Sequence, residues 1–83
     1  MLTVLLYTKD GCGLCEEVKH DLAELQARFT HQLEEVDITL DTAVFEAYKH
    51  SIPVVKIADN LLQAPITKAN LEAALHQVYK VAE

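Results

Sequence analysis

Residues 2–7 and the segment after them constrain the fold most, because the apolar pattern changes type between them. Residues 2–7 are almost continuously apolar, which is typical of a central strand covered on both faces. After a break at residues 8–11, apolar residues recur every three or four positions, the period of a helix with one buried side. The predicted buried stripe contains Leu14, Val18, Leu22, Leu25 and Phe29. This change predicts a strand followed by a helix that starts at Cys12.

The rest of the chain predicts two more helices and three more strands. Residues 32–38 have fewer apolar positions, which indicates a strand nearer the sheet edge. Asp41 is a candidate start for a short helix. Residues 54–58 and 61–63 predict a hairpin with its tight turn at Asp59-Asn60. Thr67 is a candidate cap for a last helix. The inward side chains of the two later helices are predicted to be Val44, Phe45 and Tyr48, then Leu71, Ala74, Leu75, Val78 and Val81.

The element order β-α-β-α-β-β-α predicts a single α/β domain over residues 1–83. The first βαβ unit requires parallel strands and the hairpin requires antiparallel ones. We therefore expect a mixed four-stranded sheet with helices on both faces.

Charge and hydropathy exclude several kinds of partner. The chain has 13 acidic and 7 basic residues and a formal net charge of −6. Such a chain repels phosphate backbones and anionic lipids, so we expect no nucleic-acid or membrane partner. No apolar run approaches the roughly 18 residues that a membrane span needs. We expect a monomeric cytoplasmic protein.

The two cysteines, Cys12 and Cys15, favour redox chemistry over structural bracing. The loop they close is too short to constrain much of the unfolded chain. At a helix N-terminus, unpaired backbone N–H groups and the positive end of the dipole lower a thiol pKa, and Lys9 adds a nearby cation. Gly11 and Gly13 keep the surroundings of Cys12 uncrowded. We predict that Cys12 attacks a disulfide and that Cys15, one helical turn on, resolves the mixed disulfide.

Other interpretations of the cysteine pair stay open at this point. The acidic residues Asp10, Glu16 and Glu17 oppose the effect of Lys9, so the net direction of the thiol pKa shift is undetermined. The thiols are alternatively ordinary buried residues, or belong to a non-catalytic module that senses redox state or shares an iron–sulfur cluster between two chains. Zinc needs four ligands, and His20 is expected to point away from Cys15, so we expect no metal.

Three segments carry a resemblance to the glutaredoxin family, and most of all to its small bacterial glutaredoxin-like proteins. They are Tyr7-Thr8-Lys9-Asp10-Gly11-Cys12-Gly13-Leu14-Cys15, Glu35-Val36-Asp37-Ile38 and Ser51-Ile52-Pro53-Val54-Val55. The resemblance implies a thioredoxin-like fold and a thiol–disulfide oxidoreductase that acts on protein or small-molecule disulfides. It also implies a cis Ile52-Pro53 bond beside the cysteines. Substrate contacts are then expected at Lys9, Gly13, Leu14, Ile52 and Pro53.

The chain departs from the dithiol glutaredoxins at two places. Gly13-Leu14 stands where those proteins carry Pro-Tyr, and residues 62–66 lack the Gly-Gly that helps to hold glutathione. Pro65 has no N–H, and Ala64 has a Cβ where close approach of a ligand is needed. We expect no bound cofactor. Glutathione is the co-substrate that the family implies, and these departures argue against it.

Overall fold

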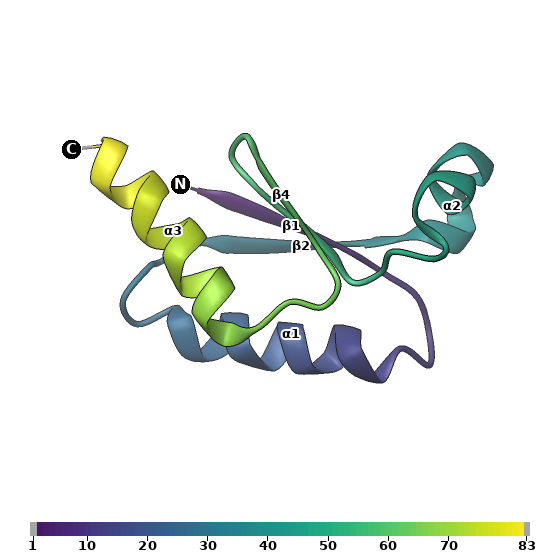
Figure 1. The fold of residues 1–83 in the computed structure, drawn as a ribbon, viewed down its shortest axis with the longest axis horizontal. Helices are drawn as coiled ribbons and strands as arrows, with labels where there is room; N and C mark the ends of the chain where they lie inside the picture. The colour runs from purple at the N-terminus through teal and green to yellow at the C-terminus, as the bar shows by residue number, and fades with distance from the viewer. Residues whose placement is uncertain (1, 83) are drawn as a thin grey trace.

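The computed structural model describes residues 2–82, and the surroundings of the side chains of residues 2–80. It contains four strands and three α-helices in the predicted order (Figure 1). The strands are β1 (Thr3–Thr8), β2 (Gln32–Asp37), β3 (Val54–Ile57) and β4 (Asn60–Gln63). The helices are α1 (Gly13–Leu25), α2 (Thr42–Tyr48) and α3 (Lys68–Ala82), with a 3-10 turn η1 (Ile38–Leu40) before α2.

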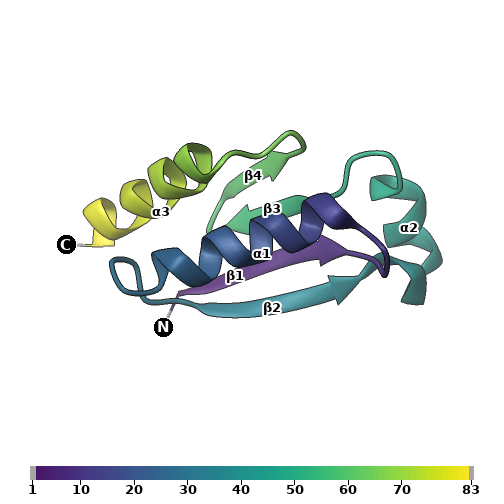
Figure 2. The same ribbon diagram turned by 90° about the horizontal axis from the view of Figure 1, so that it is seen from below.

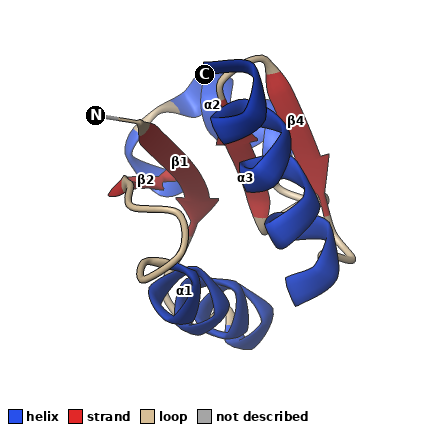
Figure 3. Cartoon of the chain, turned by 90° about the vertical axis from the view of Figure 1, so that its left-hand side faces the viewer, coloured by secondary structure: helices blue, strands red, loops and turns tan. Residues whose placement is uncertain are grey.

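The four strands form one mixed sheet in the order β2-β1-β3-β4. β1 pairs with β2 in parallel, from Thr3↔Gln32 to Thr8↔Asp37, and with β3 in the antiparallel direction. β3 and β4 form the predicted antiparallel hairpin. Figure 3 shows β2 and β4 at opposite edges of the sheet. The sequence-based prediction of a central first strand and an edge second strand is therefore confirmed.

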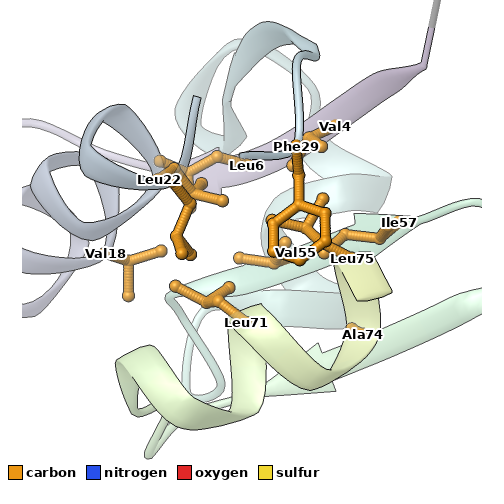
Figure 4. Close-up of a cluster of buried hydrophobic side chains, with 11 residues drawn as sticks. Val4, Leu6, Val18, Leu22, Phe29, Val55, Ile57, Leu71, Ala74 and Leu75 are labelled. Carbon is orange, nitrogen blue, oxygen red and sulfur yellow. The ribbon is translucent and has the colours of Figure 1, made fainter. Parts of the chain in front are cut away.

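Helices α1 and α3 lie side by side over one face of the sheet and enclose the main core (Figure 2). Apolar side chains of both helices meet the inward side chains of β1 and β3 there (Figure 4). The buried cluster consists of Val4, Leu6, Val18, Leu22, Leu25, Phe29, Val55, Ile57, Leu71, Ala74 and Leu75. The predicted stripes of the first and last helices are thus largely confirmed, and Val81 lies outside the side chains that the structure describes.

The opposite face of the sheet is only partly covered. Helix α2 lies at the end of the sheet where β1 and β2 finish (Figure 1), and the ring of Tyr48 stacks 4.8 Å from that of Tyr7. Further back along β1, Thr3 and Leu5 are half-buried, while Val4 and Leu6 on the α1 face are buried. The apolar run of β1 predicts that both faces of this strand are fully covered. The structure shows full cover on the α1 face only.

Polar side chains fix the starts of the two later helices. The carboxylate of Asp41 accepts hydrogen bonds from the backbone N–H groups of Ala43 and Val44, at 2.9 and 3.1 Å. The hydroxyl of Thr67 accepts from the Asn70 N–H at 3.1 Å, and the Asn70 side chain accepts from the Thr67 N–H at 3.2 Å. These contacts satisfy N–H groups that have no partner inside a helix. Both predicted helix starts are confirmed.

The structure corrects two local predictions. Leu14 is 58% exposed and does not belong to the buried stripe of α1, whereas Cys15 next to it is buried. The hairpin turn is formed by Ala58 and Asp59, because Ile57 pairs with Asn60, which is already part of β4. Ala58 adopts a φ of 53°, a left-handed conformation that is unfavourable for a residue with a Cβ.

We expect the substitution Ala58→Gly to stabilise the protein by about 1 kcal/mol, because glycine adopts a positive φ without the steric cost of a Cβ. The free energy of unfolding, measured by urea denaturation, checks this. Ala73→Gly, at an exposed site within α3, is the matched control and should destabilise by about 1 kcal/mol. A loss of stability in both variants would contradict the prediction.

Candidate functional site

The cysteine pair lies where α1 begins, at the carboxyl end of β1. Cys12 is the N-cap residue of α1, with an extended backbone (φ −89°, ψ 100°), and Cys15 lies in the first turn. The two residues form a disulfide, with their Cα atoms 5.2 Å apart. Cys12 is half-buried and Cys15 is 2% exposed. The sulfur atom that solvent and a substrate reach more easily is therefore that of Cys12.

The backbone of α1 provides a hydrogen bond to the more accessible sulfur. The N–H of Cys15 donates to Cys12 Sγ over 3.1 Å. This N–H is one of the four that an α-helix leaves unpaired at its start, and the positive end of the helix dipole adds to its effect. A donor in this position favours a thiolate over a neutral thiol. Glu16 is the acidic residue of the same turn and opposes this effect.

The two glycines contribute differently to the site. Gly11 has a φ of 81°, which L residues rarely adopt, so the turn before the cysteines requires a glycine. Gly13 has no such backbone constraint, and a Cβ there would meet nothing within 4 Å. Open space at Gly13 fits the prediction that this glycine keeps the surroundings of Cys12 uncrowded.

The structure brings some of the predicted substrate-binding residues together. Leu14 and Pro53 line one groove, and the Ile52-Pro53 peptide bond is cis, as the resemblance implies. Ile52 is half-buried, and its N–H donates to the Tyr48 carbonyl over 3.2 Å. The N–H of Ile52 is therefore already engaged and does not pair with the backbone of a substrate. Lys9 is exposed in the turn between β1 and α1.

The groove has a volume of about 230 Å³ and is lined by Leu14, the residue before Cys15, although neither cysteine lines it. One wall is formed by the first two turns of α1. The other is formed by Pro53, just before β3, and by residues 64–66, just before α3. The lining residues are Leu14, Glu17, Val18, Pro53, Ala64, Pro65 and Ile66. All of these side chains except that of Glu17 are apolar.

Sequence reasoning missed the role of Glu17 and Val18 in this groove. It treated Glu17 as a charge near the helix start and Val18 as a core residue only. Residues 64–66 were considered only because they lack the Gly-Gly of the dithiol glutaredoxins. Their position just before the last helix was the signal that they form one wall of the groove. Ala64 donates its N–H to the Ser51 carbonyl over 3.4 Å, which ties this wall to the loop before Pro53.

Residues 3–76 match the family described as Glutaredoxin-like domain (DUF836). The chain belongs to this glutaredoxin-like family. The resemblance found in the sequence is therefore confirmed over most of the chain.

Solved structures resemble this glutaredoxin-like domain over most of their length. Protein XcR50 from X. campestris is 32% identical, with a TM-score of 0.76, and the match covers 89% of this chain and 96% of that one. Protein Ne2328 from Nitrosomonas europaea is 25% identical, with a TM-score of 0.73 and coverages of 87% and 88%. Thioredoxin O2 from Arabidopsis thaliana, in its oxidized state, is 18% identical, with a TM-score of 0.77 and coverages of 95% and 76%. These matches confirm the thioredoxin-like fold.

Within residues 2–82, the glutaredoxin-like domain has no group of three or more His, Cys, Asp or Glu side chains placed to hold a metal ion. His20 lies on the exposed side of α1, where its Nε2 is 3.5 Å from Glu24. His31 is buried, and its Nδ1 is 2.6 Å from the Phe29 carbonyl oxygen, to which it donates. In the same part of the chain, no helix is long and apolar enough to cross a membrane.

Asp37 ends β2 opposite Thr8, beside the turn that leads to the cysteines. The Thr39 hydroxyl, at 2.6 Å, and the Thr39 N–H, at 2.9 Å, both donate to its carboxylate. These two hydrogen bonds, the hydroxyl's first, hold the pKa of Asp37 below its ordinary value of 3.8. The charged carboxylate therefore stabilises the folded chain above about pH 4, and this contribution is lost as the pH falls through the lowered pKa.

We expect Asp37→Asn to make stability fall less steeply between about pH 4 and pH 2, because the variant has no proton to take up there. Thermal unfolding across this range measures the slope. Thr39→Val removes the stronger of the two hydrogen bonds and should have a smaller effect in the same direction. Equal slopes for Asp37→Asn and the unaltered chain would refute this account.

Proposed function

We propose that this glutaredoxin-like domain is a thiol–disulfide oxidoreductase that reduces protein or small-molecule disulfides. The observation that carries the proposal is the difference between the two sulfur atoms. Cys12 is partly accessible and caps a helix, and Cys15 is 2% exposed and within bonding reach of it. A reactive thiol followed by a protected second thiol suits two-step exchange.

The proposed reaction starts from the reduced pair. The Cys12 thiolate attacks one sulfur of the substrate disulfide, forms a mixed disulfide and releases the first substrate thiolate, which takes up a proton. The Cys15 thiol then loses its proton, attacks Cys12 Sγ and releases the second substrate thiolate. The substrate gains two electrons, and the domain is left with the Cys12–Cys15 disulfide. An external thiol or dithiol must supply two electrons to start again.

The Cys15 N–H contributes to the step in which Cys12 attacks the substrate. It donates to Cys12 Sγ over 3.1 Å, so it stabilises negative charge on the attacking sulfur. When the pair is reduced again, the external thiol attacks the more accessible Cys12 Sγ and expels Cys15, which takes up a proton; a second thiol then releases the Cys12 thiolate, where the same N–H acts again. Neither step uses a metal ion or an organic cofactor bound in the domain.

Single cysteine variants test the two roles. With a peptide disulfide as substrate, Cys15→Ser should accumulate a covalent mixed disulfide at Cys12, because no second thiol resolves it. Cys12→Ser should form none and should reduce the substrate no faster than the uncatalysed exchange. Mass spectrometry of the non-reduced protein measures the adduct. A Cys12→Ser variant with undiminished activity would overturn the assignment.

Catalytic turnover is tested separately, because a redox-sensing module would undergo the same exchange once per molecule. With a small dithiol in excess, an enzyme should reduce many equivalents of substrate disulfide per protein molecule, above the rate of the dithiol alone. Reduction that stops at one equivalent would identify the domain as a stoichiometric sensor.

A further inference from the structure

The groove beside the cysteine pair carries an inference about the substrate, and this inference rests on the proposed function. We propose that the groove binds an extended segment of a disulfide-containing protein that carries a Lys or Arg next to its cysteine, and that Glu17 selects this cation. Glu17 supplies the one charged side chain of the groove lining. The chemistry of each wall supports this choice of ligand.

The wall formed by α1 presents an unpaired carboxylate. Glu17 is exposed, and within the described side chains it has no ion-pair partner within 4 Å. Two lysines, one on α1 and one at the start of α3, are already engaged with other acids. Lys19 Nζ lies 3.3 Å from Glu35, and Lys68 Nζ lies 3.3 Å from Glu24. A cation on the ligand is therefore the partner that this carboxylate lacks.

The opposite wall offers little to an anion. The N–H of Ala64 already donates to Ser51, and Pro65 has no N–H to offer. The N–H of Thr67, just beyond the groove, donates to the Asn70 side chain. A ligand carboxylate would therefore meet Glu17 on one side and no basic side chain on the other. This arrangement disfavours an anionic tripeptide such as glutathione.

The size and polarity of the groove favour part of a peptide over a whole small molecule. Its volume of about 230 Å³ is below the roughly 300–1,000 Å³ of typical small-molecule sites. Pro53 is buried at the base of the groove, and the apolar surface of Leu14, Pro65 and Ile66 suits the methylene stem of a long basic side chain, whose charged end reaches Glu17. The remainder of such a ligand extends along the surface outside the groove.

Two matched peptide disulfides test the proposal. Both are symmetric dimers of one short peptide with blocked ends, and they differ only in having Lys or Glu on each side of the cysteine. The protein is reduced with a dithiol, separated from it and used in excess. Loss of each peptide disulfide is then followed by chromatography in a single turnover. The readout is the ratio of the Lys-peptide rate to the Glu-peptide rate.

The unaltered protein should give a ratio roughly two- to fivefold higher than Glu17→Gln at low ionic strength, which matches the strength of exposed ion pairs. Glu17→Lys should lower the ratio below that of Glu17→Gln. High salt should bring the unaltered protein close to Glu17→Gln, because salt screens such charges. Intrinsic differences between the two peptides are the same for every variant, so they cancel when the variants are compared. A change in Cys12 reactivity affects the rates of both peptides equally, so it cancels in the ratio.

Glu16→Gln is the matched control, because Glu16 is the adjacent acid on α1 but does not line the groove. It should keep the ratio of the unaltered protein. An equal ratio in Glu17→Gln and the unaltered protein, with both peptides reduced, would overturn the inference and leave the proposed function intact. If the reduced protein reduced neither peptide, the proposed function would fail, and this inference would fail with it.

Discussion

The burial of one side of α1 against β1 is the constraint on which the site depends. Val18 and Leu22, each at most 2% exposed, pack with Val4 and Leu6 in the main core. A helix of 13 residues is marginal in water by itself, whereas each fully buried side chain of this size contributes about 1.5–3 kcal/mol. This packing therefore holds the helix start at the end of β1. The hydrogen bond from Cys15 to Cys12 Sγ exists because the turns beyond it are buried.

The reacting sulfur and the groove depend on different parts of the fold. The hydrogen bond to Cys12 Sγ comes from the first turn of α1, so this contribution to the chemistry is local in sequence. The groove needs three segments, because Leu14 and Glu17 face Pro53 and residues 64–66. Its shape therefore depends on how β3, β4 and α3 are placed against α1. Changes in the later segments can alter what binds without altering the sulfur atoms.

Periodicity predicted the order of elements and most of the core, because both follow from the pattern within single segments. It placed Leu14 in the buried stripe because the spacing to Val18 is helical, but at the first turn the same side faces the groove. The hairpin turn was predicted one residue too late, at Asp59-Asn60, because alanine has no preference for the positive φ that Ala58 adopts. Neither pattern nor propensity reports which distant segments share a groove. Glu17 and Pro65, 48 positions apart, meet only through the packing of α1 with the sheet and α3.

The acidic residues near Cys12 have opposite effects on the helix and on the sulfur. Glu16 and Glu17 interact favourably with the positive end of the helix dipole, but they repel a thiolate at the same end. Attack on a disulfide removes the negative charge from Cys12 and relieves that repulsion. A thiolate that is less stabilised is also intrinsically more nucleophilic, and exchange is fastest when the thiol pKa lies near the ambient pH. Acidic surroundings thus lower the fraction of thiolate and raise the reactivity of each one. In the proposed groove only Glu17 of these two acids also selects a cationic substrate, because Glu16 does not line it.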